Sequence, residues 1–363
     1  MPRVVGIDPG TVSFDVLGLE DGEAFLEHSL PTAELGRRPQ ALVDVLQAAR
    51  PLDLVAGPSG YGLPLVPIEA VGEREMLLLC LAGPGAAGPI GGLRALARLL
   101  REAGLPVVFT PGVIHLSTVP AHRKVNRVDL GTADKVCAAA AAIEEQARRL
   151  GVPYAETSFV LVELGGAFTG VVAVEGGCIV DGQGGSSGPP GYLAGGALDG
   201  EVACLLGRVG KEAVFSGGVA YVAGDPGATP EALAAREDEP WQLARRALVE
   251  GVLKAVAGEL ALVPGAREIL LSGRLSHVPG FREPVVSALS RLGPVRCLGL
   301  GSASAVKEAC LGAAMIADGL AGGRHRDLVD AMHLREARGT VVDHLYLSGA
   351  DEVRRWALGS ARC

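Results

Sequence analysis

The sequence predicts an α/β protein made of two lobes of related structure. The first observation is a repeat, because a strand, a glycine turn and a second strand near the N-terminus recur 155 residues later without a gap. The second is that short β-rich runs are followed by helical patterns in each half of the chain. The third is size and composition, since 363 residues with 48% hydrophobic residues can fill the cores of two ordinary domains.

The two copies of the repeat place the same residue types at matching positions. Asp8 corresponds to Glu163 and Gly10 to Gly165, so each copy has a carboxylate at a strand end and then a glycine turn. Glycine lets backbone N–H groups approach an oxyanion, and the carboxylate can hold a cation beside it. Two such hairpins facing each other would form a phosphate clamp between the lobes. Two ordinary hairpins would leave the same pattern.

The first half of the chain predicts a meander of three strands, followed by helices and further strands. A helix stops before Pro51, and the next strand ends at a Gly-Pro-Ser-Gly turn. The clearest helix has apolar residues stepping by four and three positions from Val136 to Leu150, as one helix face requires. The strands are expected at 4–8, 14–19, 25–29, 52–56 and 107–109. The helices are expected at 38–49, 72–81, 93–103 and 132–150, with a Gly/Pro-rich loop at 83–89.

The second half repeats this order. The strands are expected at 159–163, 170–174, 178–181, 268–271 and 295–298. The helices are expected at 199–206, 240–261, 279–292 and 304–321, and 225–239 is expected to be an exposed insertion. These elements predict an N-terminal lobe at 1–155 and a C-terminal lobe at 156–322. Residues 323–363 form a charged, less periodic tail to which no structure is assigned.

Composition excludes several classes of function. A net charge of −8 argues against a protein that wraps nucleic acid. No run of 18 uncharged apolar residues is present, and no basic and apolar leader precedes the first strand, so neither a membrane span nor a signal peptide is expected. The seven cysteines are scattered without metal-binding spacing, which favours free thiols and a cytoplasmic location.

The densest basic cluster lies just before the helix expected at 132–150. It contains His122, Arg123, Lys124 and Arg127, and two carboxylates follow it. Positive side chains next to a helix N-terminus suit an anionic group. Asp129 and Asp134 could act as general bases, although an Asp in a first helical turn also favours helix formation by itself.

Five short motifs, taken in order, carry a family resemblance. The five motifs are Asp8-Pro9-Gly10-Thr11, the basic loop at 121–135, Glu163-Leu164-Gly165-Gly166-Ala167, Leu271-Ser272-Gly273-Arg274, and the small residues of the last helix from Ala309 to Ile316. Over residues 4–322 the chain resembles the superfamily of acetate and sugar kinases, actin and heat-shock chaperone ATPases. Within it the chain is most similar to butyrate kinases and to a family labelled predicted butyrate kinases. The resemblance implies two duplicated ribonuclease H-like lobes, the actin-like ATPase fold, with ATP in the cleft between them.

The resemblance implies a role for each motif. The phosphate-binding residues would be Asp8, Gly10, Thr11, Gly165, Gly166 and Ala167. Asp8 and Glu163 would hold Mg²⁺, and the adenosine would contact Ser272, Gly273 and Arg274. The acceptor would be bound by Gly60, His122, Arg123 and Lys124, and the candidate catalytic residues are Arg127, Asp129 and Asp134. The small residues of the last helix would connect the lobes at the hinge.

The sequence departs from the kinases at two positions. Pro58 stands where acetate and butyrate kinases have an Arg that is thought to bind the substrate carboxylate. Thr110 stands where butyrate kinases have an Asp. The chain therefore lacks two of the residues on which the family's chemistry depends for phosphoryl transfer to butyrate itself.

Two functions from different classes follow. The first is an ATP-dependent kinase that uses Mg²⁺ and phosphorylates a small anionic acceptor, a carboxylate or a related molecule. The resemblance also allows this kinase to be a homodimer. The second is an actin-like or chaperone-like ATPase switch that acts on a protein partner. A lobe pair that binds nucleotide without chemistry is a third option. Turnover stimulated by an acceptor favours the kinase, and turnover stimulated by a partner favours the switch.

Overall fold

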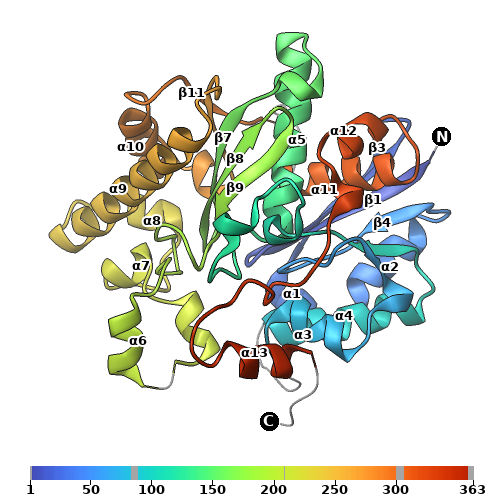
Figure 1. Ribbon diagram of the computed structural model, residues 1–363, viewed down its shortest axis with the longest axis horizontal. Coiled ribbons are helices and arrows are strands. Elements are labelled where there is room, and N and C mark those ends of the chain that lie inside the picture. The colour runs from blue at the N-terminus through green and yellow to red at the C-terminus, as the bar shows by residue number, and fades with distance from the viewer. Residues whose placement is uncertain (1, 83–88, 208, 300–305, 359–363) are drawn as a thin grey trace.

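The computed structural model describes residues 2–82, 89–207, 209–299 and 306–358, and it confirms the predicted α/β class. Two mixed sheets are present (Figure 1). The first has the strand order β3-β2-β1-β4-β6-β5. Its strands are β1 (Arg3–Pro9), β2 (Ser13–Glu20), β3 (Glu23–Pro31), β4 (Leu54–Ala56), β5 (Val66–Pro67) and β6 (Val107–Phe109).

The second sheet has the strand order β11-β10-β7-β8-β9. Its strands are β7 (Phe159–Leu164), β8 (Thr169–Glu175), β9 (Cys178–Gln183), β10 (Ile269–Ser272) and β11 (Val295–Cys297). In both sheets an antiparallel meander of three strands is extended by parallel strands. The register shift between Gly18 and Leu19 recurs between Ala173 and Val174, again 155 positions later. The duplication seen in the sequence is therefore a duplication of sheet geometry, including its bulge.

Helices follow the strands in both halves of the chain. The α-helices of the first half are α1 (Thr32–Arg37), α2 (Gln40–Ala48), α3 (Glu73–Cys80), α4 (Pro89–Glu102) and α5 (Ala133–Leu150). Those of the second half are α6 (Gly200–Leu206), α7 (Val219–Val222), α8 (Pro230–Ala234), α9 (Glu239–Leu262), α10 (Pro279–Leu289), α11 (Glu308–Leu320), α12 (Arg326–Ala331) and α13 (Ala350–Ala357). The 3-10 turns are η1 (Ile68–Ala70), η2 (Val113–His115), η3 (Ala121–Lys124), η4 (Tyr154–Glu156), η5 (Lys211–Phe215), η6 (Arg274–His277) and η7 (Leu334–Glu336).

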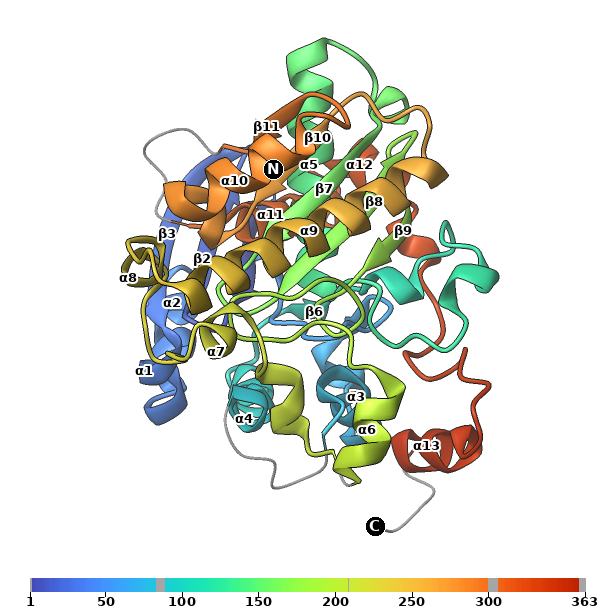
Figure 2. The same cartoon turned by 90° about the vertical axis from the view of Figure 1, so that its left-hand side faces the viewer.

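The helices α5 and α11 form a layer between the two sheets (Figure 1). Alternate residues of β7 face opposite ways, as the pleat requires. Phe159 and Leu161 join the core that contains both helices and the first sheet. Val160 and Val162 join a second core beneath α9, which crosses the outer face of the second sheet (Figure 2). One hydrophobic core therefore spans both halves of the chain.

Two glycines allow this central layer to pack closely. A Cβ added at Gly6 of β1 would lie 2.2 Å from the backbone nitrogen of Ala314 in α11. A Cβ added at Gly312 would lie 1.7 Å from the backbone oxygen of Cys137 in α5. The expectation that the small residues of the last helix permit close packing is confirmed at Gly312. A larger residue at either position would separate the elements that join the two sheets.

The structure corrects two expectations about the C-terminal half. The segment 225–239 is not simply an exposed insertion, because it forms α8 and buries Leu233 completely in the second core. Within the tail at 323–363, α12 packs on α11, and Leu328 and Val329 join the first core. The helix α13 contacts α3 of the first half. These short buried clusters lack the periodicity by which longer helices can be predicted.

Two expected elements fall partly outside the described residues. Positions 83–88 of the expected loop lie there, and Pro89, the last residue of that loop, instead begins α4. The first residues of the helix expected at 304–321 also lie there, and α11 begins at Glu308. In the part of the chain that the structure describes, no helix is long and apolar enough to cross a membrane.

The close contact between α11 and α5 predicts a large effect of a small substitution. Gly312→Ala should lower the free energy of unfolding by about 2 kcal/mol or more, because the added methyl group must displace one helix from the other. Denaturant unfolding followed by circular dichroism measures this change. The matched control is Gly200→Ala in α6, where a Cβ meets nothing within 4 Å. Equal stability of the two variants would contradict the packing described here.

Candidate functional site

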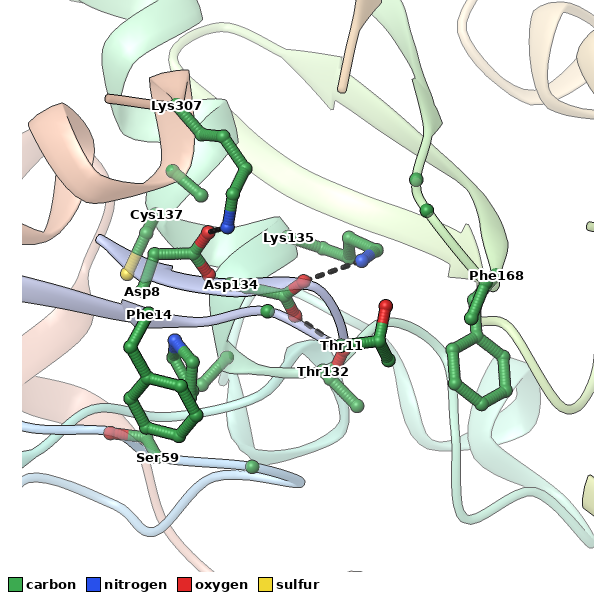
Figure 3. Close-up of a pocket in the computed structure, with 18 of the residues that line it drawn as sticks. Asp8, Thr11, Phe14, Ser59, Thr132, Asp134, Lys135, Cys137, Phe168 and Lys307 are labelled. Atoms are coloured by element: carbon green, nitrogen blue, oxygen red, sulfur yellow. Dashed lines mark hydrogen bonds and ion pairs between the residues drawn. The ribbon is translucent and has the colours of Figure 1, made fainter. Parts of the chain in front are cut away.

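One cavity of about 510 Å³ lies where the two halves of the chain meet. The first half contributes the turn between β1 and β2 and the start of α5, and the second half contributes the turn between β7 and β8. Figure 3 shows Phe14 and Phe168 on opposite sides of this pocket. Polar groups at the ends of strands and helices therefore meet between apolar walls, an arrangement typical of small-molecule sites.

The two glycine turns of the repeat face each other across the cavity. A Cβ added at Gly166 would lie 3.2 Å from Cγ2 of Val12 and 3.4 Å from Oγ1 of Thr11. All residues that the sequence assigns to phosphate binding line the cavity. They are Asp8, Gly10, Thr11, Gly165, Gly166 and Ala167. The absence of a side chain at Gly166 lets the two turns approach each other closely at the cavity.

The first carboxylate of the repeat is paired with a lysine from the far end of the chain. Asp8 is buried and accepts a hydrogen bond from Nζ of Lys307, the residue just before α11 (Figure 3). The same Nζ lies 3.3 Å from Oδ2 of Asp15. Burial raises the pKa of Asp8, and the attraction of Lys307 opposes this rise. The pKa of Lys307 is raised in turn, because its two carboxylates outweigh its own burial.

A second charge cluster lies at the start of α5. Lys135 Nζ is 2.5 Å from Oδ2 of Asp134 and also pairs with Glu163 of the opposite half. Thr132 donates a hydrogen bond of 2.5 Å to Oδ1 of Asp134 (Figure 3). Burial alone would raise the pKa of Asp134, but Lys135 and Thr132 outweigh it and hold that pKa below its usual range. Burial raises the pKa of Glu163, with Lys135 acting against it.

The predicted metal-binding carboxylates do not form a closed metal site by themselves. Among the described residues, no three His, Cys, Asp or Glu side chains come together in a way that could hold a metal ion. Asp8 and Glu163 both line the cavity, and each faces a lysine. Mg²⁺ is usually held by one or two carboxylates, water and substrate phosphates. The donor set therefore fits a Mg²⁺ ion that arrives with a phosphate ligand.

Asp129 lines the cavity but its oxygens are already occupied. Oδ1 accepts a hydrogen bond of 3.1 Å from the backbone of Gly131. Oδ2 accepts hydrogen bonds from the backbone and hydroxyl of Ser186, at 3.0 and 2.9 Å. A Cβ at Gly184 would overlap this carboxylate. Through these hydrogen bonds Asp129 connects the glycine-rich loop after β9 to the basic loop. This is a structural role.

The basic residues predicted to bind the acceptor do not line the cavity, and neither does Arg127, which was predicted to be catalytic. Nη1 of Arg123 donates to the backbone oxygen of Val180 at 2.8 Å, and Lys124 Nζ donates to that of Leu116 at 2.8 Å. His122 and Arg127 are exposed. None of these four basic residues is among the described residues that line the cavity. The loop forms η3 and packs against β9, so its charges serve the fold, and we do not include them in the site.

Of the three residues predicted to contact adenosine, one reaches the cavity. Arg274 lines it from η6. Ser272 is buried at the end of β10, and Gly273 turns the chain with a φ of +83°. A Cβ at Gly273 would lie 2.7 Å from the backbone oxygen of Leu164, so only glycine fits this close approach. Gly273 therefore positions Arg274 at the cavity.

Hydroxyl groups occupy the region around Pro58 and Thr110, the two positions where the resemblance implies Arg and Asp. The backbone N–H of Thr110 donates to Oγ of Ser59 at 2.8 Å, and its hydroxyl donates to the same oxygen at 3.0 Å. Both residues and Gly60 line the cavity. The residue next to Pro58, rather than Pro58 itself, thus contributes to the site. This part of the cavity is polar but uncharged.

Sequence reasoning missed the lysines of the site. Lys135, Lys211 and Lys307 all line the cavity, and they are three of the five lysines among 33 basic residues. In a chain that otherwise uses arginine, a lysine marks a position where a compact charge on a flexible stem is required. This scarcity was the signal that the sequence offered, but it does not separate the three from Lys124 and Lys254, which are not among the described residues that line the cavity.

The chain matches, over residues 6–347, the family described as "Protein of unknown function (DUF1464)", and it belongs to that family. No curated protein matches the chain. Similar solved structures include a propionate kinase from Francisella tularensis subsp. tularensis SCHU S4, with 15% identity over 86% of this chain and 98% of that chain and a TM-score of 0.60.

The chain is also similar to the acetate kinase of Porphyromonas gingivalis, with 18% identity over 81% of this chain and 88% of that chain and a TM-score of 0.57. A putative N-acetylmannosamine kinase, the Lmo2764 protein of Listeria monocytogenes, has 15% identity over 86% of this chain and 97% of that chain and a TM-score of 0.50. These similarities confirm the predicted two-lobe fold of the acetate and sugar kinase superfamily. They do not separate butyrate kinases from the other members.

The facing glycine turns predict a localised effect on ligand binding. Gly166→Val should weaken MgATP binding by at least about 10-fold, because the new side chain would fill the gap toward Thr11 and Val12. Calorimetric titration measures this affinity. The matched control is Gly227→Val in an exposed turn, where a Cβ comes only within 3.9 Å of Asp225. Unchanged affinity in a folded Gly166→Val variant would remove the turns from the site.

Proposed function

We propose that the protein is an ATP-dependent phosphotransferase that acts on a small carboxylate, as butyrate kinases do. The single observation that carries the proposal is that two duplicated glycine turns face each other over one cavity lined by buried carboxylate–lysine pairs. Backbone N–H groups and lysines are the donors that a polyphosphate requires. Phosphoryl transfer needs mainly positioning and neutralisation of charge, which such a cavity can supply.

Different residues of the chain would bind the phosphates, neutralise their charge and hold the metal ion. The turns at 10–11 and 165–167 would bind the phosphate oxygens, and Lys307 and Lys135 would neutralise them. Asp8 and Glu163 would hold a Mg²⁺ ion through its water ligands. When bound, Mg²⁺ supplies positive charge that stabilises the transferring phosphoryl group. Arg274 would contact the nucleoside side of the donor.

The state of the carboxylates favours a carboxylate acceptor over an alcohol. An alcohol must lose its proton to a base as it attacks phosphorus. The pKa of Asp134 is held low beside Lys135, which makes Asp134 a poor base, and both oxygens of Asp129 accept hydrogen bonds from Gly131 and Ser186. A carboxylate is already ionised near neutral pH.

In the proposed step, one acceptor oxygen forms a bond to the γ-phosphorus. The bond from that phosphorus to the β–γ bridging oxygen breaks, and its electron pair leaves with ADP. The products are an acyl phosphate and ADP, and no proton is released or consumed. Two of the similar structures, a propionate kinase and an acetate kinase, support this acceptor class.

The test measures ADP formation from MgATP by the full chain, with linear and branched monocarboxylates, their amides and alcohols, and sugars as acceptors. We expect turnover that only the acids stimulate, and an acyl phosphate that hydroxylamine traps as a hydroxamate. Stimulation by sugars or alcohols would contradict the acceptor class. Turnover that no small acceptor changes would favour the ATPase switch instead.

The environment of Asp134 predicts a modest effect of its neutralisation. Asp134→Asn should lower acid-dependent kcat by about 10-fold, below the roughly 10²-fold or greater loss expected for a general base, because it disturbs only the charge balance around Lys135. Steady-state kinetics in H₂O and D₂O measure the loss and detect any proton transfer in the rate-limiting step. A loss above about 10²-fold, together with a solvent isotope effect in the wild type, would make Asp134 a base.

A further inference from the structure

One lysine of the cavity differs from the other two. Lys211 lies in η5, and its Nζ donates a hydrogen bond of 3.1 Å to the hydroxyl of Tyr61. It also lies 4.8 Å from the centre of that ring. Tyr61 belongs to the loop after β4 in the first half of the chain. The contact therefore joins the two halves at the edge of the cavity.

Lys211 carries a charge for which the fold supplies no close partner. Lys135 and Lys307 each face two carboxylates. No carboxylate of the described residues forms an ion pair with Lys211, and its one hydrogen-bond acceptor is the neutral Tyr61 hydroxyl. Burial lowers the pKa of Lys211, with the charge of Asp129 acting against it, whereas the pKa values of Lys135 and Lys307 are raised. A half-buried cation without an ion-pair partner favours the binding of an anion.

Apolar side chains lie near Lys211 as well as the polar groups of Tyr61 and Asp129. Phe215 from the same turn packs edge-on against Phe168, with ring centres 5.2 Å apart. Burial raises the pKa of the Cys80 thiol to about 11, so this neighbour of Lys211 stays neutral. Leu79 and Leu93 lie beside Gly60, the residue before Tyr61, and line the same cavity. An anion here would have its charge on Lys211 and an apolar body against these walls.

The turn that carries Lys211 is linked to the second phosphate turn through Phe215, and Lys211 lines the same cavity as both phosphate turns. Phe168, which Phe215 contacts, follows the turn Gly165-Gly166-Ala167 directly. A carboxylate at Lys211 would thus lie on the same side of the cavity as the second glycine turn. The ammonium group would offset the repulsion between this carboxylate and the phosphates.

We propose that Lys211, steadied by Tyr61, binds the carboxylate of the acceptor, and that the acceptor is a monocarboxylate with a compact apolar chain. This inference rests on the proposed function, because it assigns the acceptor side of the same cavity. Lys211, from the opposite half of the chain, would take the role that the resemblance gives to an arginine near Pro58. The acceptor would then bind fully only where the two halves meet.

The test measures binding of butyrate, isovalerate and benzoate by calorimetry, in the presence of Mg²⁺ and a non-hydrolysable ATP analogue. Lys211→Met should weaken acid binding by about 10- to 100-fold, the loss expected for one hydrogen bond to a charged group. It should leave the affinity for the ATP analogue unchanged. Lys211→Arg should restore part of the binding, and Tyr61→Phe should cause a smaller loss than Lys211→Met.

The matched control is Lys254→Met on the exposed surface of α9, which should bind acids as the wild type does. Equal acid affinity of Lys211→Met and the wild type would overturn the inference, as would failure of the wild type to bind any of the three acids. Acid binding that depends on Lys211 but without turnover would support the inference and contradict the proposed function. Turnover of one of these acids that is as fast in Lys211→Met as in the wild type would support the proposed function and overturn the inference.

Discussion

The packing of α11 between β1 and α5 is the constraint on which the rest of the structure depends. It brings Gly6 and Gly312 so close to neighbouring backbone that no side chain fits. The two sheets share this helical layer and one continuous core, so their corresponding strand ends meet at one cavity. The position of each glycine turn is therefore set by residues far from it in sequence. Lys307 illustrates this, because the start of α11 carries it to Asp8.

The cavity balances negative charge against a few lysines. Asp8 and Asp15 share Lys307, while Asp134 and Glu163 share Lys135. Buried carboxylates are costly without such partners, and removal of either lysine would leave them uncompensated. In the proposed complex, Asp8 and Glu163 would hold Mg²⁺, and Lys307 and Lys135 would then be free to contact phosphate oxygens. Charge pairing of this kind would let a cavity rich in carboxylates accept a polyanion.

Much of this could be predicted from the sequence, because it depends on local pattern. The duplicated hairpin, the glycine turns and the clear apolar stripe of α5 each follow from neighbouring residues. The dense charge of the basic loop predicts a ligand site, whereas Arg123 and Lys124 donate hydrogen bonds to backbone oxygens in the structure. Lys211 and Lys307 could not be placed, since the partners that define them lie more than a hundred residues away. The short buried helices of the C-terminal segment were missed for want of periodicity.

The central claim is that the two glycine turns together hold the phosphates of a nucleotide. A crystal structure of the full chain with Mg²⁺ and a non-hydrolysable ATP analogue tests it most directly. The account predicts a triphosphate between residues 10–11 and 165–167, with Lys135 or Lys307 Nζ within hydrogen-bond distance of a phosphate oxygen. A nucleotide bound elsewhere, or phosphates that contact only one of the two turns, would contradict it.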